Sequence, residues 1–133
     1  MIERQVASVE ALRAGLRAMR PGEADALFYL ADAMVNSQAE SVIEAANAIK
    51  LATMFADTDT VAMGALAGYG VSYYAFGRTA ARIVLRVLKG ADPATIPVEQ
   101  LDRPHFAINL KTARLLGLRI PDVVMARAEE VIE

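Results

Sequence analysis

Residues 96–133 read IPVEQLDRPHFAINLKTARLLGLRIPDVVMARAEEVIE, and this stretch decides the fold class. The apolar run at residues 105–109 predicts a short strand, and the apolar spacing over residues 110–116 predicts a helix directly after it. Gly117 ends that helix, and Pro121 begins another short helical turn. A strand followed so closely by helices is typical of an α/β protein.

The strongest helix pattern of the chain precedes this ending, at residues 73–89. Its apolar side chains stand three or four positions apart, and basic side chains lie between them. The apolar positions are Phe76, Ala80, Ile83, Val84, Val87 and Leu88. Gly90 ends the helix. The basic side of this helix fits a solvated surface best, and an acidic partner is the alternative.

Three more apolar segments upstream predict strands, at residues 24–30, 51–56 and 64–70. We expect the first two to be buried, and the glycines of the third to lie where backbones approach closely. Helices are predicted over residues 1–20 and from a cap at Asn36 or Ser37 to about residue 50. Alternating strands and helices predict a single α/β domain over residues 1–133, with a parallel sheet and right-handed crossovers.

The composition excludes several classes of function. The chain has 133 residues, 55% of them hydrophobic, which suffices for one domain with a core. A formal net charge of −2 gives no electrostatic basis for binding nucleic acid. The absence of cysteine excludes disulfides and thiolate metal sites. No apolar run reaches the ~18–20 residues of a membrane span.

The amino-terminal segment lacks the features of a signal peptide. Residues 1–20 form an amphipathic pattern without an apolar core region or a small-residue cleavage site. We therefore expect either that an export signal lies upstream of this segment or that the product stays inside the cell.

The predicted topology points to a binding site at one rim of the sheet. In open α/β sheets, ligands bind beyond the carboxyl ends of the strands. Carboxylates at this rim would accept hydrogen bonds from an amine or from hydroxyls, and tyrosines would stack on an apolar ligand. The candidate ligand-binding residues are Asp32, Asp57, Asp59, Tyr69 and Tyr74.

Each candidate also has a structural interpretation. Asp32 fits a turn or helix cap as well as it fits a ligand contact, because aspartate commonly serves both. A solvated turn accounts for Asp57 and Asp59 slightly better than ligand binding does. Of the tyrosines at the start of the 73–89 helix, at least one should pack, so Tyr69 is the best tyrosine candidate.

No set of residues predicts catalysis, a metal or a cofactor. His105 is the single histidine, and neither a nucleophile elbow nor a second histidine at metal-ligand spacing accompanies it. The glycine-rich residues 64–70 lack the lysine of a P-loop, so they indicate a phosphate site only weakly. A doubly wound enzyme is therefore the least favoured reading.

Several motifs from residue 64 onward resemble those of a known family. Residues 64–70 read GALAGYG, and a Tyr-Tyr pair and a Gly-Arg pair follow on the next helix. Further along stand LKG, PVE, INLKTA and LGLRIP. In these motifs the chain resembles the bacterial substrate-binding proteins of ABC-type uptake systems, whose ligands include aromatic amino acids. Residues 24–35 match less sharply, so the resemblance covers nearly the whole chain.

The resemblance implies a fold and a cellular setting. Such proteins resemble two Rossmann-like lobes, as in type I periplasmic binding proteins, that close on a small ligand such as an amino acid. Residues 5–69 would belong to the second lobe, residues 73–89 would cross to the first, and the hinge and carboxyl-terminal segment would occupy 97–133. The segment would be truncated, without most of the first lobe. The implied partner is an ABC permease, and the implied location is the periplasm.

Two positions depart from the family pattern. Where the family often has Thr-Asp-Asn, this chain has Ala31, Asp32 and Ala33, so that only the aspartate is kept. Where the family often has an aspartate after its Tyr-Gly, this chain has Ser72. Both changes remove polar groups that would contact a ligand.

The apolar stripe of the 73–89 helix leads to a second functional hypothesis. Either this helix folds back onto its own sheet, or two chains associate through it, because an exposed apolar stripe is costly. We expect a homodimer. The chain would then be an intracellular interaction or regulatory domain derived from a receptor.

Overall fold

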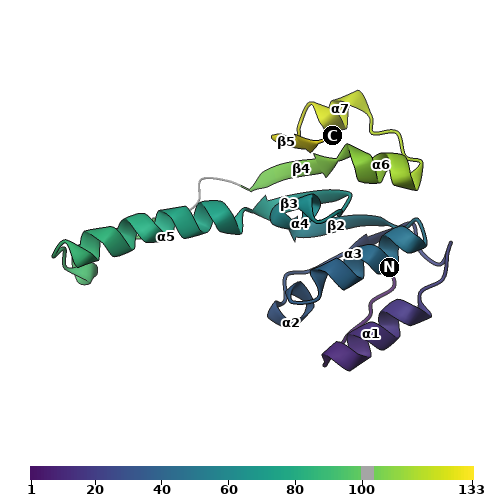
Figure 1. Cartoon of the computed structure of the whole chain (residues 1–133), viewed down its shortest axis with the longest axis horizontal. Coiled ribbons are helices and arrows are strands. Elements are labelled where there is room, and N and C mark those ends of the chain that lie inside the picture. Colours follow the sequence, from purple (N-terminus) through teal and green to yellow (C-terminus); the bar gives the residue numbers. More distant parts are fainter. Residues whose placement is uncertain (100–103) are drawn as a thin grey trace.

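The structure alternates short strands with helices along the chain (Figure 1). It is a computed structural model that describes residues 1–99 and 104–133. The helices are α1 (Val9–Ala18), α2 (Ala33–Asn36), α3 (Ala39–Ala48), α4 (Asp59–Ala62), α5 (Tyr73–Leu88), α6 (Leu110–Leu116) and α7 (Asp122–Met125). The strands are β1 (Ala26–Phe28), β2 (Ala52–Asp57), β3 (Ala67–Val71), β4 (His105–Asn109) and β5 (Glu130–Ile132). A 3₁₀ turn covers Pro93–Thr95.

The strands form one mixed sheet in the order β1-β2-β3-β4-β5. Neighbouring strands are parallel except for β3 and β4, which are antiparallel. The expected α/β class with flanking helices is therefore confirmed, whereas an all-parallel sheet is wrong.

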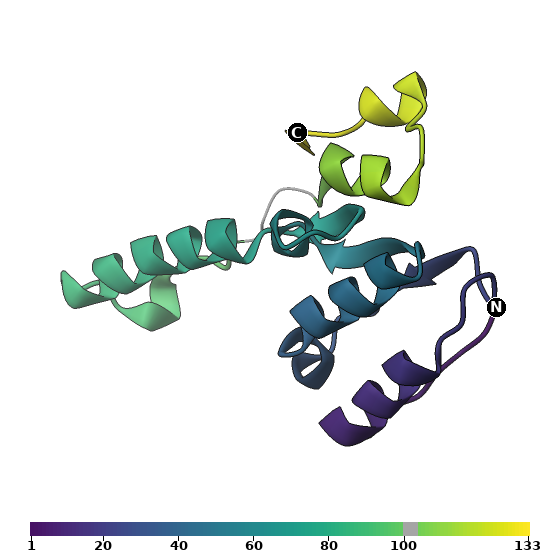
Figure 2. The same ribbon diagram turned by 45° about the vertical axis from the view of Figure 1, so that its right-hand side comes forward.

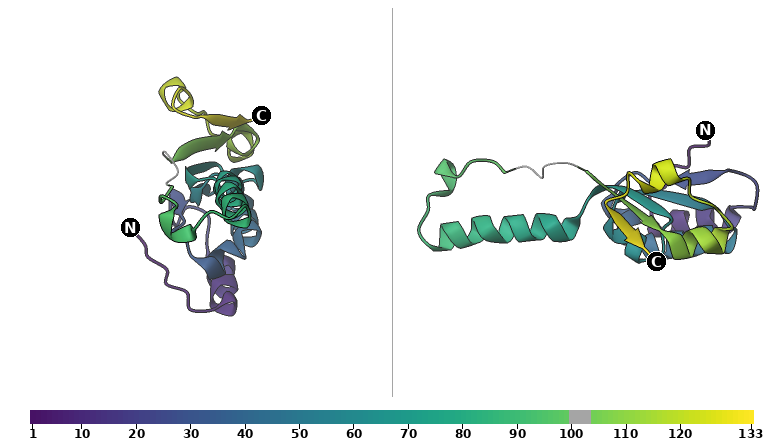
Figure 3. Two further views of the ribbon diagram at one scale, coloured as in Figure 1. Left: turned by 90° about the vertical axis from the view of Figure 1, so that its left-hand side faces the viewer. Right: turned by 90° about the horizontal axis from the view of Figure 1, so that it is seen from above.

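The path of α5 explains the antiparallel pair. A parallel sheet would require α5 to pack on the sheet and return the chain to the amino end of the next strand. Instead α5 runs away from the sheet and the chain returns beside it (Figure 3). An ion pair between Arg82 and Glu99, with a 3.4 Å N–O distance, places the returning segment alongside the helix. The chain thus re-enters the sheet near the point where it left, and β4 runs opposite to β3.

The carboxyl-terminal elements agree closely with the sequence prediction. β4 and α6 have the predicted bounds, and α7 begins after Pro121 as expected. Gly117 ends α6 in the left-handed conformation, with φ of 73°. The short strand β5 was not predicted. Residues 100–103 of the predicted hinge and carboxyl-terminal segment, 97–133, lie outside the described residues.

The amino-terminal elements depart more from the prediction. The helix expected over residues 1–20 is shorter and begins after Ser8, whose hydroxyl oxygen accepts a hydrogen bond from the Ala11 amide. The helix expected to begin after Asn36 or Ser37 is present as α3, which begins after Gln38, and the short helix α2 before it was not predicted. Asp32 caps α2, and Gln38 precedes α3 without a side-chain cap.

Strand β1 is an edge strand and not the buried strand that was expected. Phe28 is 64% exposed and Leu30 after it is 72% exposed. Only Leu27 and Tyr29 point toward the helices, where they join the main apolar core. The apolar composition of residues 24–30 therefore reflects one buried face and one open face.

Helices α3 and α4 pack against β2 on the face of the sheet that holds the buried side chains of Thr53 and Phe55. The main core lies between this face, α1 and α3, and its largest fully buried side chains are Phe55 and Ile43. A second small cluster lies under α6, around Leu66 and Leu116. Figure 2 shows α1 packed outside α3 and away from the sheet.

The other face carries an apolar row that crosses all five strands. Register pairs connect its members directly across the sheet, and they are Phe28, Met54, Ala67, Ile108 and Val131. Ile108 is buried, but the row becomes progressively more exposed toward β1. This face is therefore open on the β1 side.

Two glycines of β3 lie against the backbone of β2. A Cβ atom on Gly70 would lie 1.9 Å from the Ala56 carbonyl oxygen, and one on Gly68 would lie 2.1 Å from the Asp57 carbonyl oxygen. Both positions exclude any side chain, because such distances are far inside van der Waals contact. The expected close approach of the glycine-rich strand is confirmed.

Candidate binding site at the strand ends

The carboxyl ends of β1, β2 and β3 meet at one rim of the sheet, because these three strands are parallel. The helices α2, α4 and α5 all begin at this rim (Figure 1). Asp32 and Ser72 cap α2 and α5, and Asp59 is the first residue of α4. The structure therefore brings polar residues from the starts of three helices to one rim.

An open hollow of about 200 Å³ lies at this rim. It is lined by Asn36, Ala39, Asp57, Asp59, Thr60, Met63 and Tyr73. Enclosed small-molecule sites usually measure about 300–1,000 Å³, so this open hollow is smaller than a complete site. Its described lining contains two carboxylates and no basic side chain, which favours a ligand group with positive charge.

The two carboxylates of the hollow are fixed by different contacts. Asp57 is buried, and its Oδ1 atom accepts a hydrogen bond of 2.9 Å from the Thr60 amide. Asp59 is exposed and binds the start of α5 instead. Its Oδ1 accepts from the Ser72 hydroxyl at 3.2 Å, and its Oδ2 accepts from the Tyr73 amide at 2.9 Å. The expected solvated turn is therefore wrong for Asp57, which is buried at the end of β2, whereas Asp59 is exposed at the start of α4. Both residues line the hollow.

Asp32 caps α2 at the same rim but is not among the residues that line the hollow. Its Oδ1 atom accepts hydrogen bonds from the Met34 and Val35 amides, at 2.9 and 3.1 Å. These bonds use one carboxylate oxygen. Because the residue is exposed, the charge of Asp32 remains accessible at the rim. The cap and the ligand contact are therefore compatible roles for this side chain.

Tyr29 organises the loop after β1, a role that sequence reasoning missed. Its ring is buried and lies 4.9 Å from that of Phe55, centroid to centroid. Its hydroxyl oxygen accepts a hydrogen bond of 2.8 Å from the Asp32 amide and lies beside Asn36 Oδ1. Burial raises the pKa of Tyr29, so the phenol stays protonated. The only sequence signal was a tyrosine at the end of an apolar strand.

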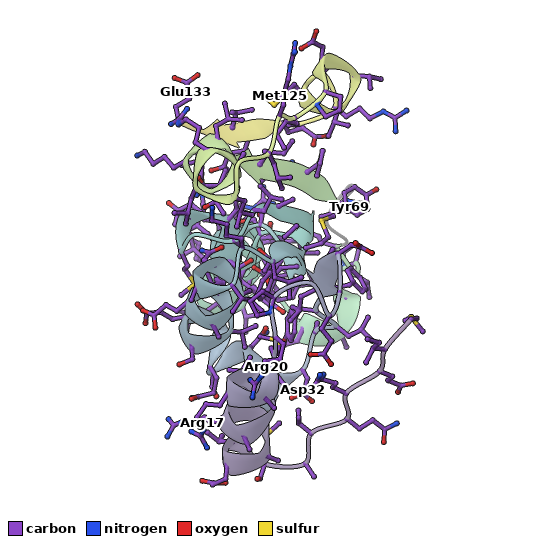
Figure 4. All side chains as sticks on the ribbon, turned by 90° about the vertical axis from the view of Figure 1, so that its right-hand side faces the viewer. Arg17, Arg20, Asp32, Tyr69, Met125 and Glu133 are labelled. Atoms are coloured by element: carbon purple, nitrogen blue, oxygen red, sulfur yellow. The ribbon has the colours of Figure 1, made fainter. Side chains whose placement is uncertain are left out.

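The other tyrosines occupy three different environments. Tyr73 begins α5 and lines the hollow. Tyr69 lies on the open face of the sheet, where its ring meets Phe106 edge to face at 6.3 Å (Figure 4). Tyr74 is 73% exposed on the first turn of α5. Sequence reasoning selected Tyr69 and Tyr74, yet only Tyr73 is among the residues that line the hollow.

Two further features of the described residues, their metal-ligand groups and the length of their helices, bear on the class of protein. Within residues 1–99 and 104–133, no three side chains of His, Cys, Asp or Glu are grouped so that they would hold a metal ion. Nor does that part of the chain contain a helix long and apolar enough to cross a membrane.

A Rossmann-like sheet with a polar rim at its strand carboxyl ends defines the class, which is an α/β domain like those of the periplasmic binding proteins. The family follows from comparison. The chain belongs to the ABC transporter substrate binding protein family, whose profile matches residues 1–132. The resemblance of its motifs is thereby confirmed.

Three relatives place the chain within this family. It is 31% identical over 98 residues to a tyrosine-binding protein of Clostridioides difficile strain R20291, a match that covers 74% of this chain and 28% of the relative. It superposes on a conserved domain protein of Vibrio cholerae with a TM-score of 0.75 and 31% identity, covering 93% of this chain and 42% of the other.

The third relative is an ABC domain from Streptococcus pneumonia, solved in complex with L-Trp. The TM-score is 0.78 at 28% identity, and the match covers 96% of this chain and 44% of the other. The chain therefore spans less than half the length of the relatives it matches. The family includes binders of aromatic amino acids.

Proposed function

We propose that this chain is a solute-binding component, or a remnant of one, of an ABC-type uptake system, and that it binds an amino acid without chemical conversion. The single observation that carries this proposal is the hollow at the strand ends, with Asp57 and Asp59 in its lining. Binding of tyrosine and tryptophan by relatives supports an aromatic amino acid as the ligand class.

The charges of the rim explain why an amino acid fits. A ligand ammonium group in the hollow would be attracted by Asp59 and by Asp32 at the same rim. The described lining of the hollow has no basic side chain. Tyr73 would offer an aromatic surface to the ligand side chain. Tyr69 and Tyr74 lie farther round the rim and would contact a ligand only from outside the hollow.

Thermal unfolding with added ligands tests this function. Tyrosine, tryptophan, phenylalanine and branched amino acids at about 100 times Kd should stabilise the folded chain by about 2.7 kcal/mol. The matched control is the same aromatic carboxylic acid without its ammonium group, which should give no shift. If no amino acid raises the melting temperature, or if the deaminated analogue works equally well, the proposal is wrong.

The domain assignment follows from the same relationship. We propose that residues 1–69 belong to the second lobe of a two-lobed binding protein, that α5 is the crossover helix and that residues 97–133 form the hinge and carboxyl-terminal segment. The protruding α5 supports this assignment, because it leaves the sheet as an element that joins another body would. A complete receptor of this kind would act in the periplasm with an ABC permease. Sequencing the DNA directly upstream tests the assignment, which requires an in-frame signal peptide and first lobe.

A second candidate function is protein interaction. It is favoured by the large apolar side chains that α5 leaves exposed, among them Phe76 and Leu88. A chain that lacks a first lobe would still present this surface. The chain would then act as a regulatory or interaction domain inside the cell.

A further inference from the structure

The side-chain amide of Asn36 lines the hollow, and the carboxylates of the rim do not account for it. Asn36 is the last residue of the short helix α2, which Asp32 caps. The Tyr29 hydroxyl donates a hydrogen bond to Asn36 Oδ1. Within the part of the chain that the structure describes, the Nδ2 group of Asn36 makes no hydrogen bond. A hydrogen-bond donor without a partner therefore belongs to the wall of the hollow.

Tyr29 fixes which end of this amide is left for a ligand. The Tyr29 ring packs against Phe55, and its hydroxyl oxygen accepts a hydrogen bond of 2.8 Å from the Asp32 amide. The hydroxyl proton has two acceptors, the Asp32 carbonyl oxygen at 2.9 Å and Asn36 Oδ1, which lies closer. Burial raises the pKa of Tyr29, so the hydroxyl keeps this proton. Asn36 Oδ1 is thus held by the protein, and Nδ2 is the free end of the amide.

An amino acid would bring a carboxylate into a hollow whose own carboxylates repel it. Asp57 and Asp59 line the hollow, and its described lining has no lysine, arginine or histidine. The ligand carboxylate therefore needs a neutral donor. The Thr60 hydroxyl is directed to the Asp57 carbonyl oxygen at 3.5 Å, and Tyr73 is 51% exposed at the start of α5. Asn36 Nδ2 is the donor of this lining that the protein already holds in one direction.

We propose that Asn36 Nδ2 donates a hydrogen bond to the carboxylate of the amino-acid ligand, and that Tyr29 is the positioning residue that directs this group. The proposal rests on the binding function proposed above, and it adds the residue that distinguishes an amino acid from an amine. The ligand ammonium group would lie beside Asp59 of α4, and the ligand carboxylate beside Asn36 of α2. A donor that is ordered before binding loses little conformational entropy when the ligand arrives.

The ratio of two affinities reports this contact. A hydrogen bond to a charged group contributes more than a bond between neutral groups, so its loss weakens binding of the carboxylate-bearing ligand. A decarboxylated amine keeps the ammonium group and the aromatic ring but makes no such bond. A substitution that only loosens the fold would weaken the amino acid and the amine alike. The ratio of the amino-acid affinity to the amine affinity therefore separates ligand contact from folding.

Calorimetric titration of the 133-residue chain with two ligand pairs tests the proposal. The pairs are L-tyrosine with tyramine and L-tryptophan with tryptamine. Asn36→Asp has nearly the same shape but no donor, so it should lower the affinity for each amino acid about tenfold or more. The affinity for each amine should stay equal or rise. Asn36→Ala removes the donor without adding charge and should lower the same ratio by about threefold or more.

Gln38→Glu is the matched control for the change of charge. It replaces an amide by a carboxylate two positions farther along, and Gln38 is not among the residues that line the hollow. Arg13 donates to Gln38 Oε1 at 3.2 Å, and a glutamate oxygen can keep this bond. The ratio of affinities should stay unchanged in Gln38→Glu. An equal fall in Gln38→Glu and Asn36→Asp would reveal only a general effect of charge and would overturn the proposal.

Tyr29→Phe tests the positioning role. It keeps the ring against Phe55 and removes the hydroxyl that holds Asn36 Oδ1. The ratio of the amino-acid affinity to the amine affinity should fall by about threefold to tenfold, because the Asn36 amide is then free to turn. In the Asn36→Asp background the same substitution should change the ratio no further. Additive losses in the double variant would overturn the positioning role of Tyr29.

The outcomes distinguish this proposal from the function on which it rests. If the unsubstituted chain binds neither member of either pair, amino-acid binding is wrong and the contact of Asn36 is wrong with it. If the chain binds an amino acid and Asn36→Asp leaves the ratio unchanged, only the assignment of Asn36 is wrong. A ratio that falls solely because the amine binds more tightly would assign Asn36 to the ammonium group and would also overturn the proposal.

Discussion

At the scale of single residues, substitutions of Asp32 distinguish its two candidate roles, helix cap and ligand contact, which the sequence favours equally. Asparagine caps helices about as well as aspartate does, so Asp32→Asn should leave the melting temperature nearly unchanged. It removes the charge and should weaken amino-acid binding at least tenfold. Asp32→Ala should also lower the free energy of unfolding by about 0.5–2 kcal/mol. Calorimetric titration and urea unfolding of both variants give the two readouts, and unchanged affinity in Asp32→Asn would assign this residue to the cap alone.

The glycines give a second residue-level prediction. Gly70→Ala should lower the free energy of unfolding by about 1–3 kcal/mol, because its Cβ would strike the β2 backbone at Ala56. Gly15, inside α1, is the matched control because no described atom lies within 4 Å of its added Cβ. Gly15→Ala should raise stability by up to ~1 kcal/mol. Equal effects of the two substitutions in urea unfolding would contradict the close approach of β2 and β3.

Residue identity alone predicted part of the rim. The sequence placed Asp57 and Asp59 after a strand, and topology then required them to lie at its carboxyl end. Tyr29 escaped notice because its role depends on burial against Phe55 and on a loop amide, neither of which has a local signal. Tyr73 was passed over for Tyr74 because neighbouring residues of a helix point in directions 100° apart, and only the structure fixes the rotation.

At the scale of elements, Asn109 connects β4, α6 and α4. Its Oδ1 atom caps α6 by accepting from the Thr112 amide at 3.0 Å, and its Nδ2 group donates to the Val61 carbonyl at 2.9 Å. Asn109→Ala should therefore lower the free energy of unfolding by about 2–4 kcal/mol.

A serine at the same position separates the two bonds. Asn109→Ser keeps a cap for α6 but is too short to reach Val61, so it should recover about 1 kcal/mol of the loss. Chemical denaturation followed by circular dichroism measures both variants. If serine recovers nothing, the bond to Val61 carries the whole effect.

The bounds of a helix were predictable where a capping or helix-breaking residue lies at its ends. Asn109 and Gly117 define α6, and Pro121 defines the start of α7. β5 has three residues and no turn signal, so it is a strand only because β4 offers it an edge. The short helix α2 was missed for a related reason, since Asp32 was weighed as a turn or helix cap but no helix was predicted directly after it.

At the scale of the whole molecule, the sheet and α5 should differ in protection against hydrogen exchange. The central strands β2, β3 and β4 make the largest share of long-range contacts, and their amides should exchange through global unfolding. Amides of α5 should exchange faster, because none of the residues of this helix is buried. Protection of the α5 amides equal to that of the central strands would contradict this difference.

The reversal of strand direction could not be read from the sequence. A helix pattern between two strands predicts a crossover, because the pattern reports amphipathicity and not the body that the helix packs on. Only the path of α5 away from the sheet shows that β4 returns antiparallel to β3. A chain that covers less than half of its relatives makes this kind of error more frequent, since apolar surface then has no visible partner.

The contacts of Asp59 have a mechanical consequence. The same carboxylate that faces the hollow holds the Ser72 hydroxyl and the Tyr73 amide, which are the first groups of α5. A helix of 16 residues is about 24 Å long, so it acts as a lever with its fulcrum at Ser72. A tilt of about 10° there would carry the far tip by about 4 Å, a displacement of the size seen in hinge motions. A ligand that pulls the Asp59 carboxylate toward itself would therefore tilt α5 about Ser72.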